Sequence, residues 1–356
     1  MRGARTLVDL LRSKQDNDKS LGQHFLINDD LIALPLQYAD IVKQDHVLEI
    51  GPGPGVLTEA LLMQGCKVTA IEIDEGAVKH LQKVFASEIT AGQLNLLSGD
   101  ALQVKWPSSI SKVVANIPYQ ISSPLVELLT KYLRNEEASL LQKVVLLVQE
   151  EFAERLVMEY ESDVGSLGMT ALLDWQSEML QKVAPHNFSP NPRVNSCFIE
   201  MTPSHEQFDC DKRLVKQVIH QAFKQRRKKI RTSLKSVPRR LNRVPNWYSA
   251  RWKMAISSLA DDERMNARPE EFDFDDWIRH LIFCVGFVGF VLLFWGRLEV
   301  TAVDEGIEED VGGFLPSVGL PFGEVDVESG RATDLWEVGT GRIFDDALGD
   351  FGQDEV

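Results

Sequence analysis

Short apolar runs alternate with amphipathic stretches up to about residue 205. Apolar runs bounded by Gly, Asp or Asn predict buried strands, and apolar spacing of three to four residues predicts helices. Strands are expected at His46–Ile50, Lys67–Ile73, Leu94–Leu97, Lys112–Ala115, Lys143–Gln149, Glu178–Val183 and Ser196–Thr202. Helices are expected up to about Ala39 after an Asn28–Asp30 cap, and at Val56–Gln64, Glu75–Ala86 and Glu150–Glu159. This alternation predicts an α/β, Rossmann-like fold with a seven-stranded, mainly parallel sheet.

Beyond Pro203 the pattern becomes helical. Helices are expected at Lys212–Arg227, around Ile230–Lys235, at Trp247–Ser257 and at Glu270–Ile278. We therefore predict a small all-helical domain after the α/β domain. The predicted division is a flexible N-terminal arm (1–19), an α/β domain (20–205), a helical domain (206–280), an apolar segment (281–298) and an acidic, disordered tail (299–356).

Composition changes this picture little. The net charge of −15 comes mainly from the segment after Glu299, where Arg331 and Arg342 are the only basic residues, so the acidity says little about the folded part. The four cysteines are far apart and lack metal-binding spacing, and no signal peptide is recognisable at the N-terminus. We therefore expect a cytoplasmic protein with no metal site.

Leu281–Trp295 is uncharged and mostly apolar. A spanning helix needs about 20 apolar residues, so this shorter segment with two glycines is not expected to cross a membrane. It could instead be a strand or helix packed on the helical domain, or sequence outside the normal boundary of the fold.

Residues Glu49 to Gly55 form a glycine-rich turn, Glu-Ile-Gly-Pro-Gly-Pro-Gly, between a strand and a helix. Such a turn can serve NAD, FAD or S-adenosylmethionine, or be only a tight connection. Glu72 ends the next strand, where an acid can bind ribose hydroxyls, and Asp100 ends the third strand, where it can bind an adenine amine. The departure from the dinucleotide pattern favours S-adenosylmethionine, although either acid could also be a solvated or capping carboxylate.

The fourth strand ends in the turn Asn116-Ile117-Pro118-Tyr119. An amide side chain and backbone carbonyls can accept hydrogen bonds from an exocyclic amine, and a ring can stack on a base. Alone, a Pro-Tyr turn after a strand is usually only a turn. Next to the glycine loop, it favours a reaction on the amino group of a nucleobase.

Several motifs together resemble those of the KsgA/Dim-type small-subunit rRNA adenine N6-dimethyltransferases over about residues 20–280. They are Gly22-Gln-His-Phe-Leu26, Glu49-Ile-Gly-Pro-Gly-Pro-Gly-Val-Leu-Thr58, Ile71-Glu-Ile-Asp74, Gly99-Asp-Ala101, Asn116-Ile-Pro-Tyr119, Gln149-Glu-Glu151, Phe188-Ser-Pro-Asn-Pro-Arg-Val-Asn-Ser196 and Phe223-Lys-Gln-Arg-Arg-Lys228. The resemblance implies an S-adenosylmethionine-dependent methyltransferase domain followed by a helical RNA-binding domain.

The resemblance also implies which residues touch the cofactor. They are His24, Leu26, Gly51, Glu72, Asp100 and Asn116, to which we add Gly53 of the glycine loop. His24 stands where the family commonly has Asn, so a backbone contact would survive there but a side-chain amide contact would not. His24 could equally be a plain loop histidine.

The implied reaction is attack of an adenine N6 amine on a sulfonium methyl, done twice. Hydrogen bonds from the amine to the Asn116 side chain and the Ile117 carbonyl would favour a tetrahedral nucleophile, mostly by positioning. Pro118 stiffens this turn. Tyr119 and Phe188 are the expected stacking pair for the extruded base, although either ring could instead be a structural anchor.

Residues 224–243 hold ten basic residues in twenty positions and no acid. A lone charge run is usually a solvated helix face, but this density favours phosphate contacts. The RNA-binding residues expected here are Lys224, Arg226, Arg227, Lys228, Lys229 and Arg231.

The leading interpretation is a ribosome-biogenesis enzyme, expected to be a monomer, that dimethylates two adjacent adenosines in a 3′-terminal loop of small-subunit rRNA in a pre-small ribosomal subunit. One alternative is an antibiotic-resistance methyltransferase of large-subunit rRNA, which shares the Asn-Ile-Pro-Tyr motif. Another is a non-catalytic RNA-binding assembly factor on the same fold. Pro52 and Val56-Leu57-Thr58 favour the small-subunit group, and the intact cofactor residues argue against the non-catalytic alternative.

Overall fold

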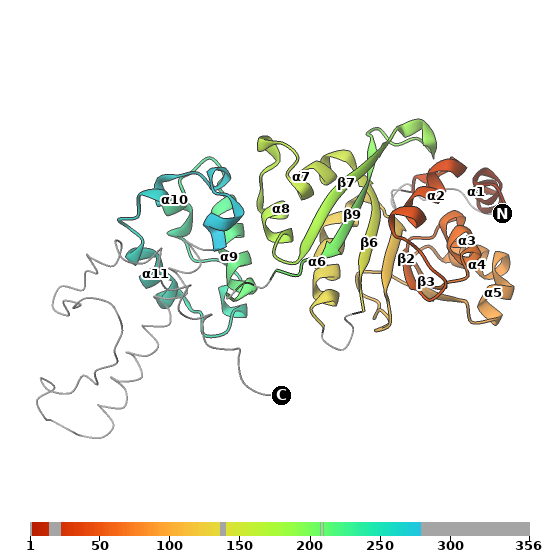
Figure 1. Cartoon of the computed structure of the whole chain (residues 1–356), viewed down its shortest axis with the longest axis horizontal. Helices are drawn as coiled ribbons and strands as arrows, with labels where there is room; N and C mark the ends of the chain where they lie inside the picture. Colours follow the sequence, from red (N-terminus) through yellow and green to blue (C-terminus); the bar gives the residue numbers. More distant parts are fainter. Residues whose placement is uncertain (1, 14–22, 136–139, 207, 209, 279–356) are drawn as a thin grey trace, which may run out of the picture. The chain divides into compact units, whose positions relative to one another are not determined.

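A seven-stranded sheet lies at the centre of the first part of the chain in this computed structural model, which describes residues 2–13, 23–135, 140–206, 208 and 210–278 (Figure 1). The strands are β2 (His46–Ile50), β3 (Lys67–Glu72), β4 (Leu94–Ser98), β5 (Lys112–Asn116), β6 (Lys143–Gln149), β7 (Trp175–Val183) and β9 (Ser196–Pro203). Their order is β4-β3-β2-β5-β6-β9-β7. The first five are parallel, whereas β9 runs antiparallel to both β6 and β7. The predicted α/β class and mainly parallel seven-stranded sheet are confirmed.

Helices cover both faces of this sheet (Figure 1). They are α2 (Asp29–Tyr38), α3 (Val56–Met63), α4 (Glu75–Val84), α5 (Ala86–Thr90), α6 (Ser122–Leu133), α7 (Glu150–Val157) and α8 (Ser166–Ala171). One apolar cluster joins the sheet to α6 and α7, and another joins it to α2, α3 and α4. Because the central strands are covered on both sides, all five residues of β2 are buried, including the polar His46 and Glu49.

The N-terminal residues correct one expectation. We predicted a flexible arm over residues 1–19, but Ala4–Arg12 form helix α1. Its apolar side buries Ala4, Leu7, Val8 and Leu11, which follow helical spacing. The predicted flexibility is wrong for this segment, because its short apolar stripe is interrupted in the sequence by Arg5, Asp9 and Arg12. Residues 14–19 lie outside the described part of the chain.

Polar contacts also tie α1 to the domain. The Arg2 side chain pairs with Glu59 of α3 at 2.9 Å, and the Ala4 amide donates to Asp29 Oδ1 at 2.9 Å. At the other end, Arg12 Nη1 donates to Ser189 Oγ at 2.8 Å. Ser189 belongs to β8 (Phe188–Ser189), which pairs antiparallel with β1 (Phe25–Leu26) in a separate two-stranded sheet. The helix therefore braces β8 through Arg12, and its Val8 and Leu11 share an apolar cluster with Phe25 of β1.

The helical part contains α9 (Lys212–Phe223), α10 (Ile230–Leu234) and α11 (Ser249–Ser258) around an apolar cluster with a fully buried Trp252. Met169 of α8 and the following Leu173 belong to the same cluster. The helical core therefore includes side chains from a segment that precedes β7. The domain boundaries themselves stay a prediction.

One buried carboxylate joins the two parts. Asp174, whose side chain is 3% exposed, accepts two hydrogen bonds from Arg134 at the end of α6, at 2.9 and 2.8 Å. Lys212 and Lys216 of α9 approach it at 3.4 and 3.1 Å. Three cations from two elements thus share one acid, and leaving it unpaired would be costly in so buried a place.

Two predicted segments, the apolar stretch 281–298 and the acidic tail 299–356, fall outside the described residues. Within the part that the structure describes, none of the helices is long and apolar enough to cross a membrane.

Candidate active site

The carboxyl ends of β2, β3, β4 and β5 meet at a cavity of about 240 Å³. Parallel strands end at one edge of a sheet, so residues far apart in sequence come together there. Ten residues singled out from the sequence line this cavity: His24, Leu26, Gly51, Gly53, Glu72, Asp100, Asn116, Ile117, Pro118 and Tyr119.

The glycine loop enters the cavity with its backbone exposed to the space. Gly51, Gly53 and Gly55 have φ angles of 67°, 53° and 86°, in the left-handed region that favours glycine. A Cβ on Gly53 would lie 2.7 Å from the Phe25 ring, and one on Gly55 would lie 2.5 Å from Phe85. The loop therefore needs glycine for its conformation and for close packing beneath it.

Glu72 ends β3 and is 4% exposed. Its two carboxyl oxygens accept hydrogen bonds from the Gly53 and Asp74 amides, each at 2.9 Å. Burial raises the pKa of Glu72, although these two amides work in the opposite direction. The carboxyl thus connects the glycine loop to the end of β3, and each oxygen keeps a further lone pair that can accept a hydroxyl.

Glu49 also lines the cavity, although its side chain is not among the site residues expected from the sequence. Burial raises its pKa to about 8, and the nearby Glu72 carboxyl adds to the rise. Thr58 Oγ1 donates a hydrogen bond to Glu49 Oε2 at 2.7 Å. A buried acid directly before a glycine loop is the signal that could have identified it.

Replacing Glu49 by glutamine should remove the pH dependence of stability that this carboxyl contributes. A carboxyl with a folded-state pKa near 8 and an ordinary value of 4.5 stabilises the fold fully below 4.5 and loses that contribution as pH rises to about 8. The wild type should therefore lose stability relative to Glu49→Gln between pH 5 and 8, by at most about 1.4 kcal/mol per pH unit.

Urea denaturation at several pH values measures this difference. The exposed Glu75 of α4 provides the control, and Glu75→Gln is compared with the wild type at the same pH values. A parallel pH response of wild type and Glu49→Gln would show that Glu49 is already ionised at neutral pH.

Asp100 follows β4 and lies at the cavity wall. Its carboxyl accepts hydrogen bonds from the Leu102 amide and from Gln103 Nε2, both at 2.9 Å. These bonds shape the turn after β4 and hold the carboxyl in place. Asp100 therefore does act as a capping carboxylate. This role leaves room for a further hydrogen bond from a ligand amine.

The turn after β5 presents Asn116, Ile117, Pro118 and Tyr119 to the same cavity. The Asn116 side-chain amide donates to the His24 carbonyl at 3.3 Å. The Tyr119 hydroxyl forms a 2.7 Å hydrogen bond with Ser196 Oγ at the start of β9, and burial raises the pKa of this phenol. The ring is therefore anchored at its tip.

His24 and Leu26 line the cavity from the small sheet, where His24 precedes β1 and Leu26 ends it. His24 Nδ1 lies 2.8 Å from the Pro190 carbonyl, and the imidazole stacks on Tyr119 with ring centres 5.9 Å apart and planes 21° apart. Leu26 is buried and pairs with Phe188 across the small sheet.

Phe188 is the predicted site residue that the structure places elsewhere. Its ring is 1% exposed, belongs to the apolar cluster between the sheet and α2, α3 and α4, and is not among the residues lining the cavity. In this structure the ring packs in the core beside the small sheet, where Phe188 pairs with Leu26, and its stacking role stays a prediction. The ring facing Tyr119 is that of His24.

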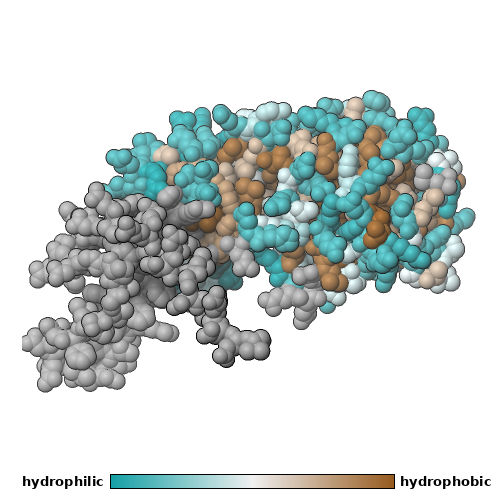
Figure 2. Space-filling model, viewed as in Figure 1, coloured by the Kyte–Doolittle hydropathy of each residue, from teal (hydrophilic) through white to brown (hydrophobic). Residues whose placement is uncertain are grey.

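Five of the predicted RNA-binding residues lie between α9 and α10 and one lies on α10. All six are exposed: Lys224, Arg226, Arg227, Lys228, Lys229 and Arg231. Arg226 approaches Glu270 at 3.4 Å, and Lys229 donates to Asn266 at 3.3 Å. Figure 2 shows a mainly hydrophilic surface over α10. None of these six residues lines the cavity, so any role that they have is separate from it.

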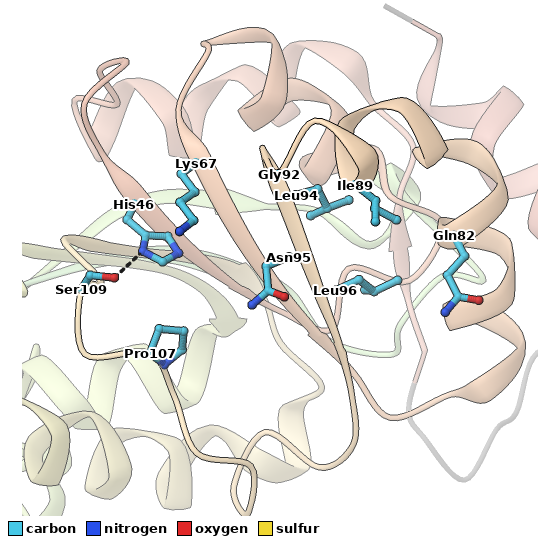
Figure 3. A pocket seen from close by; sticks show the side chains of 10 residues that line it. All are labelled: His46, Lys67, Gln82, Ile89, Gly92, Leu94, Asn95, Leu96, Pro107 and Ser109. Carbon is cyan, nitrogen blue, oxygen red and sulfur yellow. Dashed lines mark hydrogen bonds between the residues drawn. The ribbon is translucent and has the colours of Figure 1, made fainter.

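A second cavity, of about 430 Å³, lies at the opposite, amino-terminal ends of β2, β3 and β4 (Figure 3). His46 at its wall bonds Ser109 and Thr69 through its two ring nitrogens, each at 2.8 Å, and burial lowers its pKa. A neutral histidine with both nitrogens satisfied is a structural group. Across the described residues, no cluster of three potential metal ligands was found.

Known proteins resemble the chain in both sequence and structure. A sequence model described as ribosomal RNA adenine dimethylase matches residues 14–265. Ribosomal RNA small subunit methyltransferase A of Bradyrhizobium diazoefficiens is 39% identical over 226 residues, covering 62% of this chain and 78% of that protein. The protein of the same name from Brucella melitensis is 36% identical over 225 residues, covering 62% and 80%.

Two solved structures extend the comparison. A dimethyladenosine transferase from Plasmodium falciparum aligns with a TM-score of 0.62 and 26% identity, over 74% of this chain and 97% of that one. The 23S rRNA methyltransferase ErmE aligns with a TM-score of 0.53 and 23% identity, over 74% and 99%, which supports the fold alone.

Proposed function

Since this chain belongs to the ribosomal RNA adenine dimethylase family, we propose that it transfers methyl groups from S-adenosylmethionine to the N6 amines of two adjacent adenosines in a 3′-terminal loop of small-subunit rRNA. The observation that carries the proposal is the shared cavity, because the glycine loop, Glu72, Asp100 and the Asn116 turn all line it. A donor and an acceptor amine would thus be brought together at one sheet edge.

The residues of the cavity fit the proposed cofactor. Backbone without Cβ atoms lines one wall at Gly51 and Gly53. Burial raises the pKa values of Glu49 and Glu72, and a bound cation would favour the ionised form of these carboxyls. Glu72 would hold the ribose hydroxyls and Asp100 the adenine amine. When bound, S-adenosylmethionine supplies an electrophilic methyl on a sulfonium.

The Asn116 turn would orient the acceptor amine. Asn116 Oδ1 and the Ile117 carbonyl can each accept a hydrogen bond from N6–H, which draws the nitrogen lone pair out of conjugation with the ring. The Tyr119 ring offers a stacking surface, worth on the order of 1–3 kcal/mol per base. The proton is acidic once the nitrogen is alkylated, so the chain needs no strong base beside it.

The relatives favour a small-subunit substrate over a large-subunit one. The two curated relatives named above are small-subunit enzymes, and the solved structure with the higher identity is a dimethyladenosine transferase. The family of rRNA methyltransferases also supports the proposed pre-small ribosomal subunit as partner.

The test offers radiolabelled S-adenosylmethionine to purified small and large subunits that lack the methylations. We expect label in small-subunit rRNA as dimethyladenosine on digestion. Label in large-subunit rRNA would support the antibiotic-resistance alternative, and no transfer to either subunit would support the non-catalytic one.

Reversing two charges in the basic run should weaken RNA binding without affecting the cofactor. Arg226→Glu/Arg227→Glu removes two proposed phosphate contacts, so the slope of log affinity against log salt should fall by about two. Filter binding to a small-subunit rRNA fragment measures this slope. Binding of S-adenosylhomocysteine, measured by calorimetry, should stay at the wild-type value.

The exposed lysines of α4 provide a control with the same change of net charge. Lys79→Glu/Lys83→Glu should leave the salt slope nearly unchanged, whereas equal losses in the two double variants would mean that only overall charge matters. Arg226 also approaches Glu270, so thermal unfolding of each variant is measured in parallel.

A further inference from the structure

Asn116 is held in one of its two amide orientations by the backbone of His24. Its Nδ2 lies 3.3 Å from the His24 carbonyl oxygen, and a carbonyl can only accept hydrogen bonds. The amide nitrogen must therefore face His24, and Oδ1 lies on the other branch of the amide. This is the orientation in which Asn116 can accept a hydrogen bond from an amine.

The position of that carbonyl depends in turn on the His24 side chain. Nδ1 lies 2.8 Å from the Pro190 carbonyl, so the ring donates from Nδ1 and ties β1 to the segment after β8. Pro190 follows Ser189, whose hydroxyl accepts a hydrogen bond from Arg12 of α1. The chain around His24 is therefore fixed from two sides.

The imidazole also restrains Tyr119. The two rings stack at 5.9 Å and 21°, while the Tyr119 hydroxyl bonds Ser196 at 2.7 Å. One contact holds the face of the ring and the other holds its tip. A tyrosine restrained in this way presents a fixed surface to a base.

We propose that His24 is a positioning residue for the acceptor base, which sets the Asn116 amide through its backbone carbonyl and the Tyr119 ring through its imidazole. The inference rests on the proposed function and deepens it. It assigns His24 to the acceptor side of the cavity, in addition to the cofactor contact that the family resemblance implies. Its effect should therefore appear in kcat more than in cofactor affinity.

Three substitutions separate the two contacts of the His24 imidazole, one with the Pro190 carbonyl and one with the Tyr119 ring. His24→Ala removes both, the hydrogen bond and the stacking, and leaves the His24 backbone carbonyl without this support. We expect kcat for adenine methylation to fall by about 10–100-fold, as for a misplaced reacting group. His24→Asn keeps a side-chain amide that can donate to Pro190, and His24→Phe keeps a ring against Tyr119. Each should recover part of the activity lost in His24→Ala.

The affinity for the cofactor shows whether the His24 side chain contacts the cofactor directly, because only a direct contact would change that affinity. For His24→Ala, the Kd of S-adenosylhomocysteine should stay within about threefold of wild type. In an Asn116→Ala background, His24→Ala should lower kcat by less than about threefold, because residues acting as a unit are not additive. The exposed His205 serves as control, and His205→Ala should match wild type.

Nuclear magnetic resonance tests the positioning of Asn116 without measuring activity. The side-chain amide resonance of Asn116, identified by its loss in Asn116→Ala, should shift in His24→Ala and stay in place in His205→Ala. An unmoved resonance, or a large rise in Kd at unchanged kcat, would overturn the inference. Failure of the wild type to methylate either ribosomal subunit would overturn the proposed function instead.

Discussion

Replacing Asn116 by alanine should lower kcat for adenine methylation by about 10²–10³-fold, the usual cost of removing one group that stabilises a developing charge or aligns a reacting atom. Asn116 ends β5 at the cavity, where its Oδ1 is the proposed acceptor for the N6–H bond. The Kd of S-adenosylhomocysteine should rise by less than about tenfold, because Gly51, Gly53, Glu72 and Asp100 remain.

Single-turnover methylation of small-subunit rRNA measures the chemical step directly. Asn95 is a matched control, since it is an exposed asparagine on β4, which β3 and β2 separate from β5, and it lines the cavity at the opposite, amino-terminal ends of the strands. Asn95→Ala should retain wild-type kcat. If Asn116→Ala turned over within about threefold of wild type, the amide would have no part in the reaction.

Replacing Gly53 by alanine should weaken S-adenosylhomocysteine binding by about 10–100-fold, on the order of 1.4–2.7 kcal/mol. The new Cβ would meet Phe25 at 2.7 Å in a residue with φ of 53°. Relief of that contact must move either the loop or Phe25, and a moved loop loses the Gly53 amide bond to Glu72. The glycine loop and the end of β3, which form two walls of the proposed cofactor site, would then separate.

Gly92 allows the backbone cost to be measured alone. Its φ is 71°, and a Cβ there would have nothing within 4 Å, so Gly92→Ala should cost about 1–2 kcal/mol of stability and leave binding unchanged. Shortening the clashing ring in Gly53→Ala/Phe25→Leu should recover part of the affinity. Equal affinities for Gly53→Ala with and without Phe25→Leu would contradict a steric cause.

The strand pattern could be predicted because it reflects burial on both faces. The observed β2 and β6 span the predicted residues His46–Ile50 and Lys143–Gln149. The cavity could be predicted for the same reason, because parallel strands place their following turns at one edge. Asp100 and Asn116 are separated in sequence but meet there.

The parts that could not be predicted depend on pairing between distant segments. Phe188 reads as a ring in a proline-rich loop, and only its pairing with Leu26 turns it into the core. The stacking of His24 on Tyr119 likewise requires β1 and β8 to meet beside the end of β5. Sequence spacing carries no information about such pairings.

Asp174 limits how this chain can be recombined with its relatives. A helical segment exchanged at the predicted boundary near residue 206 would carry Lys212 and Lys216 away from their buried acid. It would also leave behind Met169 and Leu173, which complete its apolar core. An exchange of the helical part among these relatives should therefore keep Met169, Leu173 and Asp174 with α9, which places the boundary before Ser166 and requires an arginine at position 134 in the recipient.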